Sequence, residues 1–285
     1  LKLFEVCRMR DIPIITFVNK MDRESRDPFE ILDEVEEKLA LDTAPVTWPI
    51  GRAKSFCGSY HLAKSEVRGS DTEVKTTPVN GAQAVADRLP ENERQAFIEE
   101  LELAVEACRP FDRESFLEGH LTPVFFGSAL RHFGVDQLLE GLGAYAPPPK
   151  AVKARKNGED MHVAPGDREV TGFVFKVQAN MDPNHRDRIA MFRMASGSFK
   201  RGMKLKVQNT GKQLSVNAPI MFFASDRELA EDAYAGDVIG IPNHGVLRVG
   251  DSLSETGTLR FAGLPNFAPE ILRRVRVKDP LKAKH

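Results

Sequence analysis

The sequence predicts an α/β fold that is followed by an all-β barrel domain. In the first half of the chain, helical patterns alternate with short apolar runs, and two of these runs, at 12–18 and 122–130, end in polar residues. Beyond residue 167, short strands are separated by turns that contain Gly, which is typical of a small barrel or sandwich. We expect an α/β part at 1–146, a linker at 147–167, a β-barrel domain at 168–260 and the start of a third domain at 261–285.

The composition is that of a soluble globular protein, with 41% hydrophobic and 28% charged residues. A formal net charge of −1 argues against a protein that coats nucleic acid through bulk charge. The three cysteines are widely spaced, without a C-x-x-C, and the histidines show no paired-ligand spacing, so we expect no disulfide framework and no metal site. The absence of a long apolar run or a signal peptide predicts no membrane association.

The first three elements follow from apolar spacing and from a capping residue. Residues 1–10 indicate the end of an amphipathic helix, with Leu3, Val6, Cys7 and Met9 on one side. A strand buried on both faces is predicted at 12–18, from Ile12, Ile14, Ile15, Phe17 and Val18. Asp27 can cap a second helix and Pro28 suits its first position. The apolar residues of this helix are Phe29, Leu32, Val35 and Leu39.

The rest of the α/β part contains a long insertion and a second buried strand. A short strand is predicted within 44–51, where Val46, Trp48 and Ile50 alternate. Residues 52–110 form the insertion, of which 52–90 are predicted to be irregular. An acidic helix follows at 91–108, and its expected buried side consists of Phe97, Leu101, Ala104 and Cys108. The strand at 122–130 precedes a helix whose apolar residues are Val135, Leu138, Leu139, Leu142 and Tyr145.

Pro and charged residues dominate "APPPKAVKARKNGEDMHVAPGD" (146–167), which predicts the linker. The barrel strands are then predicted from "EVTGFVFKVQA", "DRIAMFRMASG", "GMKLKVQN" and "GDVIGIPN".

Polar residues follow both buried strands of the α/β part. Asn19, Lys20 and Asp22 come after the first strand, and Ser128, Ala129 and Leu130 come at the end of the second. Ligands of open α/β sheets bind outside the carboxyl ends of such strands. In order, in position and in the helix that follows each of them, these two sets resemble the two guanine-reading motifs of GTPases.

The chemistry of guanine explains these residue types. An ionised Asp22 can accept both N–H donors on one edge of the base. Asn19 can donate to the other edge of the ring and brace the loop, and the aliphatic stem of Lys20 can lie flat on the base. Ala129 is small enough for its backbone N–H to reach the carbonyl oxygen of guanine. These residues predict guanine binding, and we identify no catalytic residue in the chain.

The phosphate-binding motif of GTPases, G-x-x-x-x-G-K-[ST], does not occur in these 285 residues. The Gly211-Lys212 pair lacks the rest of the motif and is predicted to lie in a β-turn. The chain does not begin with Met, so we expect a fragment that lacks the phosphate-binding half of its GTPase domain and binds no nucleotide tightly by itself. We also expect the strand at 12–18 to have an unpaired edge through which the fragment can self-associate.

The long separation between the two motifs, with a β-barrel after them, resembles the translational GTPases such as elongation factor G. Within that group, "RDIPIITFVNKMDRESRDP", "TPVFFGSALRHFGVDQLL" and "TGFVFKVQANMDPNHRDRIAMFRMASG" are similar to the bacterial peptide chain release factor 3 family. The resemblance implies a cytoplasmic GTP hydrolase that uses GTP and GDP with Mg²⁺. It also implies a protein that binds the ribosome and promotes departure of the codon-reading release factors after termination.

Two alternatives stay open, an elongation factor G-like protein and a non-catalytic ribosome-binding module. Hydrolysis by this chain alone also stays open.

Two basic segments are candidates for contact with ribosomal RNA. His185, Arg186, Asp187 and Arg188 lie at a strand start, where a solvated hairpin is the alternative. Arg273, Arg274, Arg276 and Lys278 alternate in part with valines, so a charged edge strand is the alternative there.

Overall fold

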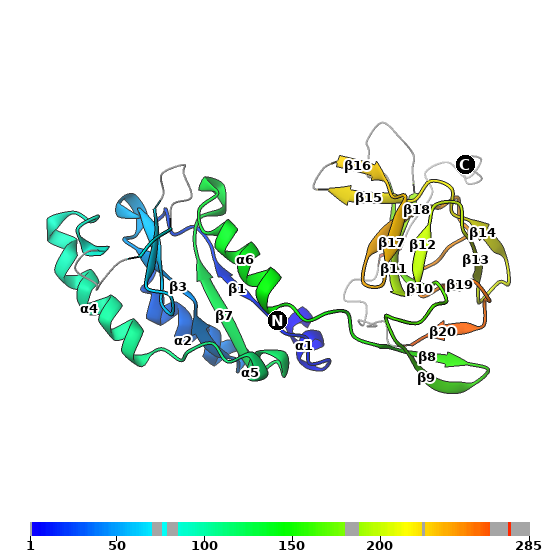
Figure 1. Cartoon of the computed structure of the whole chain (residues 1–285), viewed down its shortest axis with the longest axis horizontal. Helices are drawn as coiled ribbons and strands as arrows, with labels where there is room; N and C mark the ends of the chain where they lie inside the picture. The colour runs from blue at the N-terminus through cyan, green and yellow to red at the C-terminus, as the bar shows by residue number, and fades with distance from the viewer. Residues whose placement is uncertain are drawn as a thin grey trace. The chain divides into compact units, whose positions relative to one another are not determined.

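The computed structural model describes residues 2–69, 76–78, 85–179, 188–223, 226–262 and 273–274. The chain divides into two units, Leu1–Pro147 and Pro148–His285 (Figure 1). The first unit is α/β and the second is built from antiparallel strands, which confirms the predicted fold class. Of the predicted third domain only residues 261–262 and 273–274 are described, and of the two basic segments only Arg188, Arg273 and Arg274, so these predictions lie largely outside the described residues.

The first unit combines a parallel sheet and an antiparallel sheet with helices. Its helices are α1 (Lys2–Arg8), α2 (Pro28–Leu39), α4 (Glu91–Ala107), α5 (Arg113–Leu117) and α6 (Val135–Tyr145), with the 3₁₀ helices η1 (Ala53–Ser55) and η2 (Ala129–Arg131). Its strands are β1 (Thr16–Val18), β2 (Asp42–Pro45), β3 (Thr47–Ile50), β4 (Gly58–His61), β5 (Glu66–Gly69), β6 (Thr76–Pro78) and β7 (Leu121–Phe126). The parallel sheet has the order β1-β7-β2, and the antiparallel sheet has the order β3-β4-β5-β6.

Helix α2 begins as the sequence predicts. The Asp27 side chain accepts a hydrogen bond from the Phe29 N–H at 2.8 Å, and Pro28 occupies the first turn, where it has no helical hydrogen bond to lose. The cap fixes the end of the connection between β1 and α2, which carries Asn19, Lys20 and Asp22.

Strand β1 is shorter than predicted, and the expected burial on both faces is wrong. It covers Thr16–Val18 instead of 12–18, and Ile12 keeps 43% of its surface exposed. Pro13 has no N–H to donate to a neighbouring strand, and the Ile14 carbonyl accepts a hydrogen bond from the Thr122 hydroxyl at 2.8 Å. Regular pairing with β7 therefore begins only at Thr16.

The insertion is more regular than predicted, because its residues 58–78 carry three strands that extend the sheet begun by β3. The sequence hides this sheet because small and polar residues occupy buried positions. The fully buried Ser59 hydroxyl donates to Gln137 Oε1 at 2.6 Å. Gly58 packs closely against β5, because a Cβ there would lie 2.7 Å from the Arg68 carbonyl oxygen. Hydrophobic alternation is therefore absent where the strands run.

Helix α4 confirms the predicted acidic helix and its buried side. Phe97, Leu101 and Ala104 are buried, and Cys108 packs against the same core at the end of the helix. This core also contains Trp48, which joins α4 to the antiparallel sheet.

The helix predicted after the second buried strand is present as α6, and the apolar side expected for residues 1–10 is only partly buried. Leu3 and Met9 at α1 expose 72% and 83% of their surfaces. In α6, Leu139 and Leu142 are exposed while Gln137 and Gly141 are buried. Helix α6 packs through its polar and small residues because Gln137 binds Ser59 and Gly141 fits against the Phe125 ring.

The second unit has a curled antiparallel sheet of eight strands in the order β14-β13-β19-β10-β11-β18-β15-β16 (Figure 1). Its strands are β8 (Val152–Lys156), β9 (Glu159–Val163), β10 (Thr171–Ala179), β11 (Arg188–Ser196), β12 (Ser198–Lys200), β13 (Lys204–Val207), β14 (Gln213–Ser215), β15 (Ile220–Phe223), β16 (Asp226–Leu229), β17 (Asp232–Tyr234), β18 (Val238–Pro242), β19 (Ser252–Ser254) and β20 (Leu259–Phe261). All four predicted barrel strands are present as β10, β11, β13 and β18. Gly211-Lys212 lies in the β13–β14 turn, as predicted.

The expected linker is largely folded. Residues 152–163 form the hairpin β8–β9, which pairs with β20 into a three-stranded sheet. Only Ala154 and Val163 are buried in this hairpin, so its sequence looks like a charged connection although it is a pair of strands. Within the described residues, no helix has both the length and the apolarity needed to cross a membrane.

Candidate functional site

The two sets of predicted site residues lie on adjacent loops at one edge of the parallel sheet. We call residues 19–23 the first loop and residues 127–133 the second loop. Strands β1 and β7 are parallel, with Val18 opposite Phe126, so both loops leave the sheet at its carboxyl edge. The Gly127 N–H donates to the Val18 carbonyl at 3.0 Å, and the Met21 N–H donates to the Gly127 carbonyl at 3.1 Å. The loops are therefore tied together by their backbones.

Asn19 joins the two loops with its side chain. Its Oδ1 accepts hydrogen bonds from the Lys20 N–H at 2.8 Å and from the Ala129 N–H at 2.9 Å. The bracing role expected of Asn19 is thus present in the geometry. The Ala129 N–H, which the sequence assigns to the carbonyl of a base, instead donates to Asn19 in this structure. With its oxygen so occupied, Asn19 has its amide nitrogen to offer a ligand.

Asp22 is a well-shielded carboxylate at the junction of the loops, with 9% of its side-chain surface exposed. The adjacent Ser128 hydroxyl is the largest cause of a pKa lowered below the ordinary value of 3.8, and Arg131 lowers it further. The Arg131 Nε lies 3.7 Å from the Asp22 Oδ2. Among the described residues, the buried Ser128 Oγ has no hydrogen-bond partner of normal geometry, so its hydroxyl is free to donate to Asp22. Asp22 is therefore ionised at neutral pH and can accept hydrogen bonds.

Lys20 and Leu130 are both exposed to solvent. Lys20 has φ +71°, a left-handed conformation that is uncommon outside Gly, and its carbonyl accepts the Arg23 N–H at 3.0 Å. Leu130 exposes 76% of its surface. The aliphatic stem of Lys20 and the side chain of Leu130 offer apolar surface on the two loops, which suits a flat ring with polar edges.

The second loop is closed by a pair of backbone hydrogen bonds. Ser128 and Phe133 donate to each other's carbonyls at 2.9 Å, which encloses η2 between them. Gly127 is required here, because a Cβ at this position would lie 2.4 Å from the Phe133 oxygen. This closure holds Ser128 and Ala129 in place opposite the first loop.

The sequence did not predict two residues that belong to this site. Arg131 pairs with Asp22, and it follows Ser128-Ala129-Leu130 directly, so its position in the motif was a usable signal. Ala53 donates its N–H to the Met21 carbonyl at 2.9 Å. It lies in the insertion, more than thirty residues from the first loop and outside any motif, so no sequence signal indicated it.

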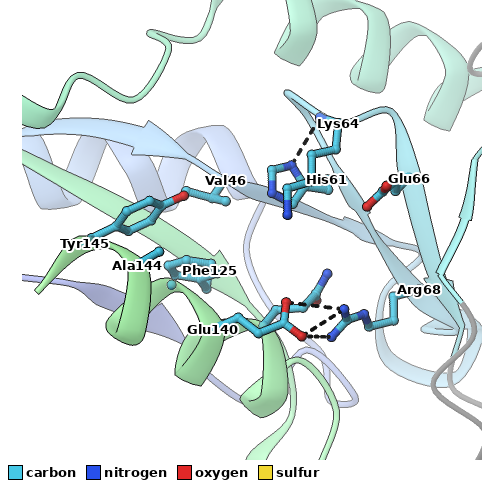
Figure 2. A pocket seen from close by; sticks show the side chains of 11 residues that line it. Val46, His61, Lys64, Glu66, Arg68, Phe125, Glu140, Ala144 and Tyr145 are labelled. Carbon is cyan, nitrogen blue, oxygen red and sulfur yellow. Dashed lines mark hydrogen bonds and ion pairs between the residues drawn. The ribbon is translucent and has the colours of Figure 1, made fainter.

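A separate pocket of about 80 Å³ lies between the β4–β5 hairpin and α6 (Figure 2). Arg68 points into it from β5 and pairs with Asp136 and with Glu140, whose Oε1 lies 3.2 Å from Nη2. Burial is the largest cause of a lowered pKa at His61, whose Nδ1 accepts the Lys64 N–H at 3.3 Å. The arginine is already neutralised by two carboxylates, and the residues that line this pocket do not include the predicted site residues.

Among the described residues, no group of three or more His, Cys, Asp or Glu is placed to hold a metal ion. We therefore assign no metal ligand among these residues and no chemical step to a metal.

Two parts of the chain match models of known protein families. Residues 1–148 match the elongation factor Tu GTP binding domain, and residues 169–256 match elongation factor G domain 2. The first match covers more than half of the chain and includes both loops.

Proposed function

The chain belongs to the translational GTPases, whose GTP-binding domain it carries, and from this premise we propose that the two loops of the first unit recognise the base of a guanine nucleotide. The observation that carries the proposal is the meeting of Asn19, Asp22 and Ala129 at one sheet edge, where the Asn19 side chain binds the second loop. The proposed site contains Asn19, Lys20 and Asp22 of the first loop. It also contains Ala129 of the second loop, whose N–H donates to Asn19. Ser128 and Leu130 complete the site.

The hydrogen-bonding pattern of guanine supports this assignment. An ionised Asp22 accepts from both N1–H and the N2 amine, and the Asn19 amide nitrogen donates to the opposite edge of the ring. Adenine presents the wrong pattern to Asp22, because it would place an acceptor where the carboxylate needs a donor and leave the carboxylate without its hydrogen bonds. Ser128 contributes indirectly, since its hydroxyl lowers the pKa of Asp22 further below the ordinary value. No residue of the site is assigned to catalysis.

The finer role that we propose is that of a release factor 3-like protein in the cytoplasm. Such a protein binds the ribosome, hydrolyses GTP and promotes departure of the codon-reading release factors. The sequence segments that resemble that family support this role. In a ribosome assay with labelled release factor, the full-length protein should raise the rate of release factor departure. If it instead drives tRNA movement, the elongation factor G-like alternative holds, and if it binds without hydrolysis, it is a non-catalytic module.

Base recognition is tested by Asp22→Asn, which replaces one acceptor oxygen with an amide donor. The amide opposes the N2 amine of guanine but matches the carbonyl that xanthine carries at the same carbon. We expect the variant to lose GDP binding by roughly ten- to a hundredfold and to prefer xanthosine diphosphate. Nucleotide titrations followed by NMR measure both affinities, including the weak binding expected of a chain without the G-x-x-x-x-G-K-[ST] motif.

The matched control is Asp33→Asn, the same chemical change on the exposed face of α2. It should leave the GDP and xanthosine diphosphate affinities unchanged. A GDP affinity unaltered by Asp22→Asn would remove Asp22 from base recognition and refute the proposal.

A further inference from the structure

A five-residue segment of the insertion contacts both loops of the proposed guanine site. We call residues 52–56 the support segment; it contains η1. The Ala53 N–H donates to the Met21 carbonyl in the first loop at 2.9 Å. The Phe56 ring packs edge-on against Phe133 of the second loop, with ring centroids 5.0 Å apart at 89°. One short segment therefore contacts both of the loops that we propose to bind the guanine base.

The contact with Met21 bears directly on Asp22. The Met21 N–H is held by Gly127 and its carbonyl is held by Ala53, while its side chain is fully buried. Both peptide groups of Met21 are thereby fixed, and the next side chain along the chain is that of Asp22. A shift of the support segment moves one of these two anchors.

The support segment is in a strained conformation that its surroundings must maintain. Ala53 has φ +51°, a left-handed conformation that is unfavourable for a residue with a Cβ. The preceding Gly51 has φ +73°, and a Cβ there would lie 2.3 Å from the Ser55 carbonyl oxygen. A segment of this kind keeps its shape only when neighbouring groups hold it.

Arg52 is the group that holds it. Its Nη2 lies 2.8 Å from the Asp27 Oδ2 and 2.5 Å from the Glu100 Oε2. Asp27 caps α2, the helix that follows the first loop along the chain, and Glu100 lies on α4. The Glu100 Oε1 also accepts the Trp48 indole N–H at 2.9 Å. The guanidinium thus links the support segment to two helices, and its side chain keeps only 31% of its surface exposed.

We propose that Arg52 is a positioning residue for base recognition, which acts through the support segment on the orientation of Asp22. The inference rests on the proposed function, because it concerns the alignment of the carboxylate with the N1–H and N2 amine of guanine. Arg52 does not contact the base in this account. Its ion pairs with Asp27 and Glu100 hold the backbone of the support segment in place. The Ala53 N–H of that segment then holds the Met21 carbonyl, and this contact orients the adjacent Asp22.

The test compares GDP with inosine diphosphate, which lacks the N2 amine. The ratio of their affinities reports whether Asp22 engages both donors, and a loss of general stability does not change that ratio. In Arg52→Gln we expect the preference for GDP to fall about three- to tenfold relative to wild type, in NMR titrations of the full chain. We also expect the backbone amide resonances of Met21 and Asp22 to shift.

The matched control is Arg26→Gln, which removes an ion pair with Glu34 on the exposed side of α2 and should leave the ratio unchanged. If Arg52→Gln fails to fold, Glu100→Gln decides, since its amide oxygen can still accept the Trp48 indole N–H while the ion pair is lost. It should lower the ratio in the same direction.

The outcomes separate the inference from the function on which it rests. An unchanged ratio in folded Arg52→Gln, even with lower thermal stability or with equal losses for both nucleotides, would overturn the positioning role alone. Wild-type chain without a preference for GDP over inosine diphosphate would overturn the proposed function and the inference together.

Discussion

Glu100 shows how one residue of the first unit can cost stability while it fixes geometry. Burial is the largest cause of a pKa raised above the ordinary value of 4.5, and Arg52 and the Trp48 hydrogen bond only partly offset it. Folding thus disfavours the charged form relative to the unfolded chain, although that form carries the ion pair with Arg52. Buried ion pairs often contribute little to stability when compared with neutral residues.

Glu100→Gln should therefore change the pH dependence of stability. Because the folded chain has the higher pKa at this group, it binds the proton more tightly than the unfolded chain above pH 4.5. The stability contributed by Glu100 is highest below 4.5 and is lost as the pH rises through the folded pKa. The variant should gain free energy of unfolding relative to wild type between pH 4.5 and 7, measured by denaturant titration. A variant whose free energy of unfolding falls relative to that of wild type as the pH rises would contradict this prediction.

Helix α6 contains two glycines whose surroundings differ sharply although they are two residues apart. A Cβ at Gly141 would lie 2.4 Å from the Cζ of Phe125, a core ring with 2% of its surface exposed. A Cβ at Gly143 would meet nothing within 4 Å. The first glycine is needed for close packing of the helix on β7, and the second has no such role.

Substitution of each glycine by Ala should change stability in opposite directions. Gly143→Ala should add ~0.5–1 kcal/mol to the free energy of unfolding, because Ala loses less conformational entropy than Gly in a helix interior. Gly141→Ala should remove ~1–3 kcal/mol, because the added methyl group overlaps the Phe125 ring and either the ring or the helix must shift. Each variant is the control for the other in a denaturant titration, and equal effects would show that packing at Gly141 does not limit α6.

The elements that the sequence predicted well are those whose burial follows hydrophobic spacing. Phe97, Leu101 and Ala104 recur along α4 at helical intervals, and they are the residues that the core encloses. Strand β4 was not predicted because its buried residue Ser59 is polar, and the hydrogen-bond partner that allows its burial, Gln137, lies 78 residues away. The hairpin β8–β9 failed because its charged face dominates its sequence. Local pattern does not encode such long-range partners.

The same distinction applies to the candidate site. The two loops could be predicted because Asp22 and Ser128 follow recognisable strands in a recognisable order, although their role in base reading stays a prediction. The support segment could not be predicted, because Ala53 is linked to Met21 by a single backbone hydrogen bond, which any residue except Pro can donate. Backbone contacts leave no signature in residue type.

At the scale of the whole molecule, each unit has its own hydrophobic core. Trp48, Leu101 and Phe126 belong to a core of the first unit, and Phe192 and Leu205 belong to that of the second. Units with separate cores commonly unfold as separate cooperative transitions. We expect the same of this chain.

Phe192→Ala should lower the transition of the second unit only. Phe192 is fully buried, and truncation of such a ring costs ~3–5 kcal/mol. Leu101→Ala is the matched change in the first unit and should lower the other transition. Calorimetry on the two variants measures both effects, and a shift of both transitions by either substitution would show that the units unfold as one.

The pairing of β8 with β20 has a consequence for how the second unit is made. Leu259 lies opposite Lys156, so the hairpin that opens this unit receives its third strand from roughly a hundred residues later in the chain. Chains are synthesised at roughly 5–20 residues per second, and the hairpin therefore emerges about five to twenty seconds before its partner. During that interval the face that carries Ala154 and Val163 has no third strand beside it. During synthesis, this three-stranded sheet therefore cannot be complete until β20 has emerged.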